Sequence, residues 1–234
     1  MENFLSDDQR RMLGAMNIPL WVCRPAARVA IEANVEVSST SGGDEDATWS
    51  IFQNEVSGCT NCQLHKSRTQ TVFGVGSHSA DWMIIGEAPG ADEDRLGEPF
   101  VGKAGQLLNE MLRAVGLDRE QVYIANILKC RPPGNRDPQA DEVSACSAFL
   151  NRQVELIQPR LILAVGRIAA QNLLQQDLPV GRLRGSVHRF GRDDIPVVVT
   201  YHPAYLLRSP SQKRKAWVDL CLAQSVVASQ QSTA

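Results

Sequence analysis

The sequence contains four short apolar runs, at residues 82–85, 122–128, 161–165 and 196–200. Each run is bounded by Gly, Pro or charged residues and is too short for a buried helix, which is the pattern of a buried strand. The segments between the runs hold apolar residues at helical spacing, and one helix is expected to begin near Ala104. Strands that alternate with helices predict an α/β fold with a central four-stranded, mainly parallel sheet that helices cover on both faces.

Local signals complete the expected order of elements. Further helices are expected at residues 48–58, 138–157, 168–174 and 213–228. Asp137 and Pro138 are typical of an N-cap and a first helical residue. A turn is expected at residues 73–76 and a solvated acidic loop at 92–94.

Each predicted strand ends in a loop of unusual composition. The four loops read GEAPG, NILKCRPP, VGR and YHPAYLL in chain order. Parallel strands place their carboxyl ends at one edge of the sheet, where α/β proteins bind ligands. We therefore expect these four loops to meet and to form the functional site.

A change of composition marks the start of the domain. Residues 37–47 are rich in Ser, Gly and acidic side chains, which is typical of a flexible linker. We expect an N-terminal helix or peptide with this linker at residues 1–47, one domain at 48–229 and a tail at 230–234.

Composition and charge narrow the class of protein. The 234 residues are 43% hydrophobic and 21% charged, as in ordinary globular proteins. No membrane span and no signal peptide is evident, so a cytoplasmic location without membrane contact is expected. The net charge is −2, but the first 50 residues carry four excess acidic side chains and the remainder two excess basic ones. A mildly basic domain permits DNA binding.

Four of the six cysteines form a pattern that suggests a metal site. Cys59 and Cys62 form a C-x2-C pair, and Cys130 and Cys146 follow much later in the chain. Cysteines in a chain of cytosolic character favour metal or redox use over disulfides. Four thiolates suit a tetrahedral zinc or an iron–sulfur cluster, and the spacing does not separate the two.

Several longer motifs carry a family resemblance. The segments GEAPGADED, EPFVGKAG, YIANILKCRPPGNRDP, GRLRG and YHPAYLLR occur in this order between about residues 50 and 222. Together they resemble the family 4 uracil-DNA glycosylases, which carry a [4Fe–4S] cluster. The resemblance implies a three-layer uracil-DNA glycosylase-like fold and a monomer that removes uracil from DNA. It also implies that the four cysteines hold the cluster.

The resemblance assigns the uracil pocket to three separated residues. A glycosylase must flip its target nucleotide out of the duplex into a pocket. Phe100 would stack on the flipped base, and the Asn126 amide would pair with its Watson–Crick edge. His202 would donate a hydrogen bond to O2, where negative charge develops as the glycosidic bond breaks.

Three more residues complete the predicted pocket. Gly86 belongs to the strand-end turn that binds substrate, and Glu87 is the candidate for stabilising the sugar cation and orienting the water. The best-known uracil glycosylases place an Asp in this motif where the present sequence has Ala88. Glu93 would exclude the methyl group of thymine, since Gly90 aligns with the tyrosine that usually does so.

The remaining predicted site residues contact DNA. Leu206 would wedge into the gap left by the flipped base, with Leu207 as the alternative. Arg208 would contact phosphates, as would the basic segments at residues 131–136 and 181–185.

Residues 10–25 carry a second, shorter resemblance, to the opening peptide of the psi subunit of bacterial clamp loaders. That peptide binds the chi subunit, so docking to chi is expected here. Two alternatives to the enzyme remain: a non-catalytic replisome subunit on a glycosylase scaffold, and a related branch that traps uracil-DNA covalently. The short loop at residues 131–137 lacks the His-containing insertion of that branch.

Overall fold

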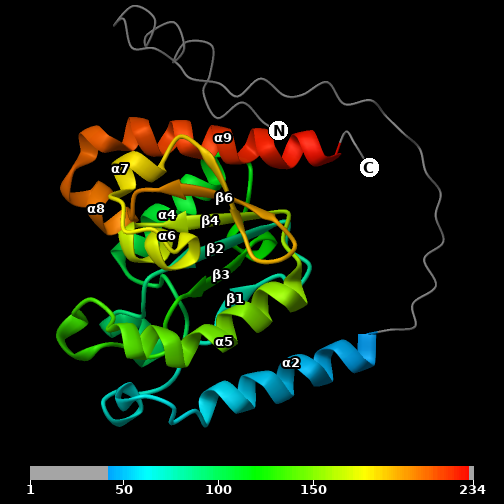
Figure 1. Ribbon diagram of the computed structural model, residues 1–234, viewed down its shortest axis with the longest axis vertical. Coiled ribbons are helices and arrows are strands. Elements are labelled where there is room, and N and C mark those ends of the chain that lie inside the picture. The colour runs from blue at the N-terminus through cyan, green and yellow to red at the C-terminus, as the bar shows by residue number, and fades with distance from the viewer. Residues whose placement is uncertain (1–41, 232–234) are drawn as a thin grey trace, which may run out of the picture. The chain divides into compact units, whose positions relative to one another are not determined.

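The computed structural model describes residues 42–231, which form one six-stranded sheet with helices on both sides (Figure 1). The sheet order is β1-β3-β2-β4-β6-β5. The strands span Val75–Gly76 (β1), Trp82–Gly86 (β2), Tyr123–Asn126 (β3), Leu161–Val165 (β4), Val187–Phe190 (β5) and Ile195–Thr200 (β6). The four central strands β3, β2, β4 and β6 are mutually parallel and are the four that the apolar runs predict, so the predicted fold class is confirmed.

Two antiparallel strands at the sheet edges were not predicted. β1 pairs with β3 within the segment expected to be a turn, and β5 pairs with β6. β1 has only two residues, too few to show an alternating pattern. An added Cβ at Gly76 would lie 1.8 Å from the carbonyl oxygen of Val122, so a side chain there would prevent this pairing. β5 is only half-buried, as suits an edge strand.

Helices precede the first strand, separate most of the later ones and follow the last. They span Gly42–Ser57 (α2), Ala91–Leu96 (α3), Lys103–Ala114 (α4), Ala140–Ile157 (α5), Arg167–Leu174 (α6), Val180–Leu183 (α7), Pro203–Arg208 (α8) and Lys213–Gln231 (α9). Short 3-10 helices span Gln63–Lys66 (η1), Arg119–Gln121 (η2), Pro133–Asn135 (η3) and Pro210–Gln212 (η4).

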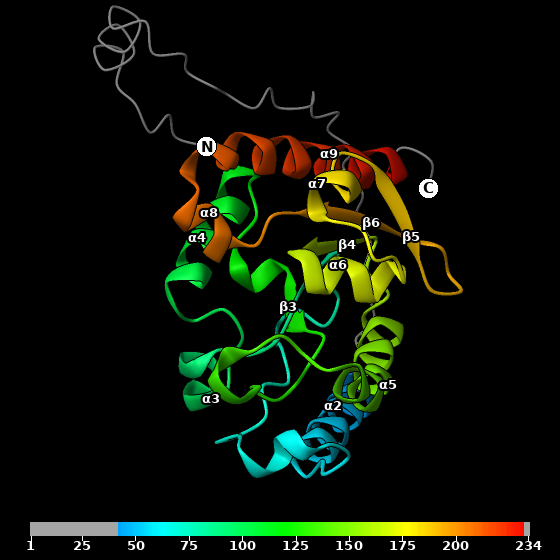
Figure 2. The same ribbon diagram turned by 60° about the vertical axis from the view of Figure 1, so that its left-hand side comes forward.

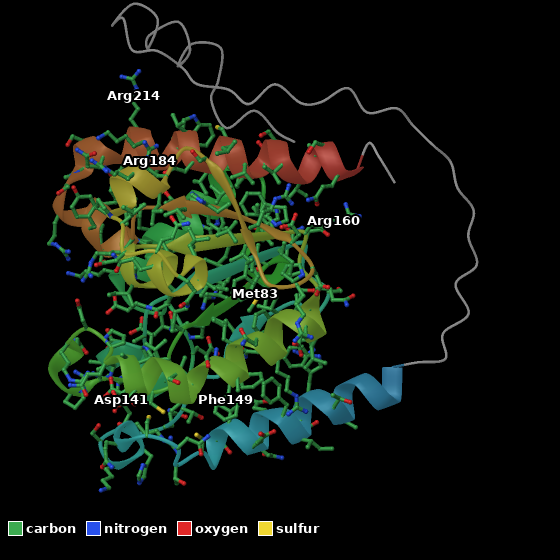
Figure 3. The ribbon with its side chains drawn as sticks, in the orientation of Figure 1. Met83, Asp141, Phe149, Arg160, Arg184 and Arg214 are labelled. Atoms are coloured by element: carbon green, nitrogen blue, oxygen red, sulfur yellow. The ribbon has the colours of Figure 1, made fainter. Side chains whose placement is uncertain are left out.

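Two hydrophobic cores, one on each face of the sheet, hold the layers together. Alternate residues of β2 point to opposite faces, so Met83 and Ile85 join one core and Ile84 joins the other. The first core contains residues of α2, α5 and α6, and the second contains residues of α4 and α9. Figures 1 and 2 both show α9 on one side of the strands and α5 with α2 on the other. Figure 3 labels Met83 in the sheet and Phe149 on α5, two members of the first core.

Three expected element boundaries differ from the structure. α2 begins at Gly42, so residues 42–47 of the expected linker are helical. α5 begins at Ala140 with Gln139 as its N-cap, because Gln139 and Glu142 form a capping box. The expected acidic loop is the helix α3, whose first turn holds three carboxylates that suit a helix N-terminus.

The parallel strands end at the same edge of the sheet. In the register between β2 and β3, Gly86 lies opposite Asn126, and between β4 and β6, Val165 lies opposite Thr200. The loops that follow these strands therefore emerge side by side, as predicted. No helix in the described part of the chain is long and apolar enough to cross a membrane. The psi-like segment at residues 10–25 lies outside the described residues.

Candidate active site

A cavity of about 490 Å³ lies at the carboxyl edge of the sheet. Six of the residues predicted for the site line it, namely Glu87, Glu93, Phe100, Asn126, His202 and Arg208. They come from the loops after β2 and β6, from the last residue of β3, from the segment between α3 and α4, and from α3 and α8. The volume falls in the range of small-molecule sites. The structure thus brings together the residues that the sequence separates by up to 121 positions.

Phe100 lines this cavity, and Gly86 lies directly behind its ring. The Phe100 ring is 6% exposed and stacks against His202, with ring centroids 5.6 Å apart and planes inclined by 29°. A Cβ added at Gly86 would lie 2.6 Å from Cζ of Phe100 and 2.4 Å from Oδ1 of Asn126. Only glycine at the end of β2 lets the ring and the amide approach each other this closely.

Asn126 offers a buried amide to the cavity. It is the last residue of β3 and only 2% exposed. Its backbone carbonyl accepts a hydrogen bond from Nζ of Lys129 at 2.9 Å, whereas the structure shows no hydrogen bond to its side-chain amide among the described residues. The amide therefore keeps a donor and an acceptor for a ligand.

His202 is held in one tautomer and in the neutral form. It is the N-cap of α8, and its Nδ1 accepts a hydrogen bond from the Ala204 amide at 3.1 Å. Burial lowers the pKa of His202 to about 4, assisted by the positive charge of Arg208 and opposed by Glu93. Because Nδ1 is an acceptor, the ring proton resides on Nε2, which leaves that N–H free to donate.

Glu87 supplies a carboxylate at the opening of the β2 loop. Burial raises the pKa of Glu87, Asp137 raises it further, and Arg167 opposes both. The Glu87 carbonyl accepts a hydrogen bond from the Leu128 amide at 3.1 Å, which fixes the loop after β2 to the segment that follows β3.

Glu93 contacts the segment that carries Phe100. Its Oε1 accepts hydrogen bonds from the amides of Val101 at 3.1 Å and Gly102 at 3.3 Å. Glu93 also lines the cavity, as its predicted role beside the base requires. An added Cβ at Gly90 would lie 2.6 Å from Oε2 of Glu93, so the glycine leaves room for this carboxylate.

The structure favours Leu207 over Leu206 as the residue that faces DNA. Leu206 is 1% exposed and packs in the core beside α4 and α9, whereas Leu207 is 44% exposed. Pro203 and Leu206 are the buried positions of α8, so one face of this short helix is fixed against the core. This corrects the prediction that Leu206 is the wedge. The exposed ring of Tyr205, which was not predicted, also lines the cavity.

Two of the basic residues predicted to contact phosphates pair with buried carboxylates instead. Arg136 donates to both carboxylate oxygens of Glu142, which is 2% exposed. Arg184, labelled in Figure 3, donates to both carboxylate oxygens of Asp219, at 2.8 and 3.1 Å. Asp219 is fully buried and also accepts from Thr200 at 3.0 Å. Within the 181–185 segment, Arg182 is the exposed cation.

The four cysteines of the predicted metal site line a second, small cavity. Cys59 and Cys62 precede η1, Cys130 follows β3, and Cys146 lies on α5. Burial raises the pKa of Cys146 to about 11, with smaller upward contributions from Cys130 and Cys59 and with Lys129 opposing the shift. A negative charge on one of these sulfurs disfavours ionisation of its neighbours, so several of them become thiolates readily only when a cation is bound between them. Such thiolates are the ligands of a metal ion or an iron–sulfur cluster.

Among residues 42–231 no group of three or more His, Cys, Asp or Glu side chains has the geometry to hold a metal ion. The residues around the sulfurs nevertheless suit a cluster. The Arg68 guanidinium donates to the Cys130 sulfur at 3.2 Å, and the Lys129 amide donates to the Cys146 sulfur at 3.3 Å. Such hydrogen bonds stabilise thiolates that ligate iron.

A buried polar network, which was not predicted, joins the two cavities. Lys129, the first residue of a stretch expected to be a basic loop, is 1% exposed. Its ammonium donates to the Asn126 carbonyl at 2.9 Å and to Oε1 of Gln153 at 2.6 Å. Gln153 in turn donates to the Phe73 carbonyl at 2.9 Å and the Tyr123 hydroxyl at 3.1 Å. The one available signal was a lysine between an apolar strand and a candidate cysteine ligand.

Comparison with known proteins agrees with the fold. The profile of the Uracil DNA glycosylase superfamily matches residues 73–224, so the chain is of this class. A type-4 uracil-DNA glycosylase of Archaeoglobus fulgidus is 48% identical over 168 residues, which cover 69% of this chain and 84% of the relative. That of Thermotoga maritima is 43% identical and covers 70% and 85%. A type-5 enzyme of Pyrobaculum aerophilum is 35% identical over 43% of this chain and 50% of its own. The chain belongs to the type-4 uracil-DNA glycosylase family.

Proposed function

We propose that this protein excises uracil from DNA by hydrolysing the N-glycosidic bond, the first step of base excision repair. The observation that carries the proposal is that Phe100, Asn126 and His202, from three separate segments, line one cavity of about 490 Å³. A stacking ring, a free amide and a neutral imidazole donor are the groups that recognition and departure of uracil require.

Recognition depends on Phe100 and Asn126. The flipped base stacks on the Phe100 ring, which offsets part of the cost of unstacking it from the duplex. The Asn126 amide donates to O4 of uracil and accepts from N3–H. Cytosine presents the opposite pattern at both positions, and leaving a buried amide unpaired costs about 1–3 kcal/mol. Glu93, which lines the cavity, excludes the methyl group at C5 of thymine.

Bond cleavage depends on His202 and Glu87. As the bond breaks, negative charge develops on O2 of uracil, and Nε2–H of His202 donates to it. A preorganised donor of this kind contributes about 100- to 1000-fold in rate. Because the imidazole is neutral, it is too weak an acid to transfer its proton, so it stabilises the base by a hydrogen bond and the base leaves as an anion. The Glu87 carboxylate stabilises the sugar cation and orients the attacking water.

Contacts with DNA flank the cavity. Leu207, exposed on α8, enters the gap left by the flipped nucleotide, which offsets its unstacking. Arg208 lies next in sequence, lines the cavity and contacts a backbone phosphate.

A [4Fe–4S] cluster held by Cys59, Cys62, Cys130 and Cys146 is part of the proposal. The shared cavity, the hydrogen bonds to two of the sulfurs and membership of the type-4 family support it. When bound, the cluster would crosslink the segment between α2 and η1 to the β3–α5 loop and to α5. Its role would be structural, because the cysteines line a cavity separate from the one that holds His202.

An excision assay tests the proposed function. Purified protein is incubated with a labelled single-stranded oligonucleotide that holds one uracil, and alkali then cleaves any abasic site. The expected result is cleavage at uracil and none in matched oligonucleotides with cytosine or thymine. An inert complex would indicate a non-catalytic DNA-binding subunit, and an adduct resistant to SDS would indicate covalent trapping.

Asn126→Ala and His202→Gln separate the two roles in the same assay. Asn126→Ala should weaken the preference for uracil over cytosine, whereas His202→Gln should slow excision about 100-fold and leave the preference intact. Equal behaviour of the two variants would contradict the assigned roles.

Contact with a clamp-loader chi subunit through residues 10–25 stays a prediction, since these residues lie outside the described part of the chain. Calorimetric titration of a peptide of residues 1–30 into chi tests it, and absence of binding would end it. The monomeric state and the cytoplasmic location also stay predictions.

A further inference from the structure

Phe100 has a strained backbone. Its φ angle is +55°, in the left-handed region that bulky L residues rarely adopt. Such a conformation persists only when surrounding groups hold it, and it often marks a functional position. The consequence for Phe100 is that its ring, 6% exposed, is directed against His202 and into the cavity.

Arg119 binds the strained segment through the carbonyl groups of Pro99 and Phe100. It begins η2, and its guanidinium donates to the carbonyl of Pro99 and, at 3.4 Å, to the carbonyl of Phe100. The same group donates to Oδ1 of Asn109 at 3.4 Å, which connects it to α4. A guanidinium presents several donors in one plane, so a single side chain can hold two consecutive carbonyls.

Glu93 holds the same segment from the side of the cavity. Its Oε1 accepts from the amides of Val101 and Gly102, the two residues after Phe100. The carbonyls before the turn and the amides after it are therefore all engaged. Burial lowers the pKa of Arg119, and nearby carboxylates, with Glu93 among them, oppose this shift.

Close packing completes the arrangement. An added Cβ at Gly105 would lie 1.7 Å from the carbonyl oxygen of Phe100, so α4 approaches this peptide unit as closely as a glycine allows. The Phe100 carbonyl thus lies between the backbone of α4 and the guanidinium of Arg119. Arg119 is not among the residues that line the cavity, whereas Glu93 is.

We propose that Arg119, together with Glu93, is a positioning residue that fixes the Phe100 peptide so that its ring forms the stacking wall of the uracil pocket. The claim that the ring stacks on uracil rests on the proposed function. The claim that Arg119 and Glu93 fix the Phe100 backbone does not depend on it. Arg119 acts through Phe100 and does not contact the base.

Paired variants at both residues test the positioning role. Arg119→Met keeps the length of the side chain and removes its donors, and Arg113→Met is the matched control, because Arg113 is an exposed arginine that pairs with Glu110 on α4. Glu93→Gln keeps an acceptor oxygen, whereas Glu93→Met keeps only the bulk. We expect kcat/KM for single-stranded uracil oligonucleotides to fall about 10- to 100-fold in Arg119→Met and Glu93→Met, since small misplacements of binding groups cost this much. Arg113→Met should stay near wild type, and Glu93→Gln should lose less activity than Glu93→Met because it keeps an acceptor for the amides of Val101 and Gly102.

A second readout keeps the test independent of uracil. Nuclear Overhauser contacts between the ring protons of Phe100 and His202 should be present in the wild type and in Arg113→Met and lost or weakened in Arg119→Met. Wild-type contacts and wild-type kcat/KM in a folded Arg119→Met would overturn the inference. Equal activity of Glu93→Met and Glu93→Gln would show that the hydrogen bonds of Glu93 to Val101 and Gly102 do not matter for activity. Glu93 would then not be a positioning residue. If the wild type fails to cleave uracil-DNA, the proposed function is lost, and the ring contacts still decide whether Arg119 positions Phe100.

Discussion

Gly86→Ala is the substitution for which the structure gives the sharpest expectation. The new Cβ would lie 2.4 Å from Oδ1 of Asn126 and 2.6 Å from Cζ of Phe100. Non-bonded carbon atoms sit at about 3.5–4.0 Å, so the overlap is about 1 Å with each group. Asn126 is 2% exposed and Phe100 is 6% exposed, so neither can swing into solvent to relieve it. Gly86 is part of β2, so alanine adds no backbone strain of its own.

The overlap translates into a rate effect. A displacement of about 1 Å of a group that orients the substrate can cost about 100-fold, which corresponds to about 2.7 kcal/mol of transition-state stabilisation. The overpacking should also lower the free energy of unfolding by about 1–3 kcal/mol. The loss of activity should therefore exceed what partial unfolding explains, because a domain with several kcal/mol of stability stays folded at that cost.

Single-turnover excision from a single-stranded uracil oligonucleotide measures the effect, and thermal unfolding shows that each variant is folded. Gly102→Ala is the matched control beside the same cavity. Its Cβ would meet Asp92 at 3.4 Å and Glu93 at 3.8 Å, which are ordinary contacts, and φ there is −78°. We expect Gly102→Ala to excise uracil at close to the wild-type rate. A folded Gly86→Ala with the wild-type rate would refute the placement of the base beside Phe100 and Asn126.

Three further predictions follow from the site. Leu207→Ala should slow excision from duplex DNA more than from single-stranded DNA, without loss of stability. Leu206→Ala should lower the free energy of unfolding, measured in urea, by about 2–5 kcal/mol. The reverse pattern of kinetics and unfolding would restore Leu206 as the wedge. The folded pKa of His202, about 4, lies below its ordinary value of 6.5, so its contribution to stability is intact above pH 6.5 and is lost as the pH falls toward 4. Nitrogen NMR of the His202 ring should show the neutral form with the proton on Nε2 at pH 6, and a titration midpoint near 6.5 would contradict this. Cys130→Ser should lose iron and the visible absorption of a cluster and should unfold at lower temperature; a colourless wild type that contains zinc would contradict the cluster.

The parts of the fold that follow from strong periodic signals could be predicted. The four apolar runs are the four central strands. A strand buried on both faces is apolar at almost every position, so it is recognisable as a continuous apolar run. Once those strands are parallel, the meeting of their carboxyl-end loops follows from geometry, so the convergence of Phe100, Asn126 and His202 was also within reach.

What escaped prediction depends on tertiary contacts. The two residues of β1 gain their strand character from pairing with β3 and not from their own pattern. On α8 both Leu206 and Leu207 are apolar, and one helical turn is too short to show which of them faces the core. The left-handed backbone of Phe100 is imposed by Arg119 and Glu93, which no local pattern connects to it. Lys129 reads as part of a basic loop, but its hydrogen bonds to Asn126 and Gln153 allow it to be buried.

A crystal structure of the protein with bound uracil tests the central claim most directly, because it shows where the base lies in relation to Phe100, Asn126 and His202. We expect the pyrimidine to lie against the Phe100 ring, with the Asn126 amide at O4 and N3 and Nε2 of His202 within hydrogen-bond distance of O2. Uracil bound elsewhere, or bound in the cavity with O2 directed away from His202, would contradict the account.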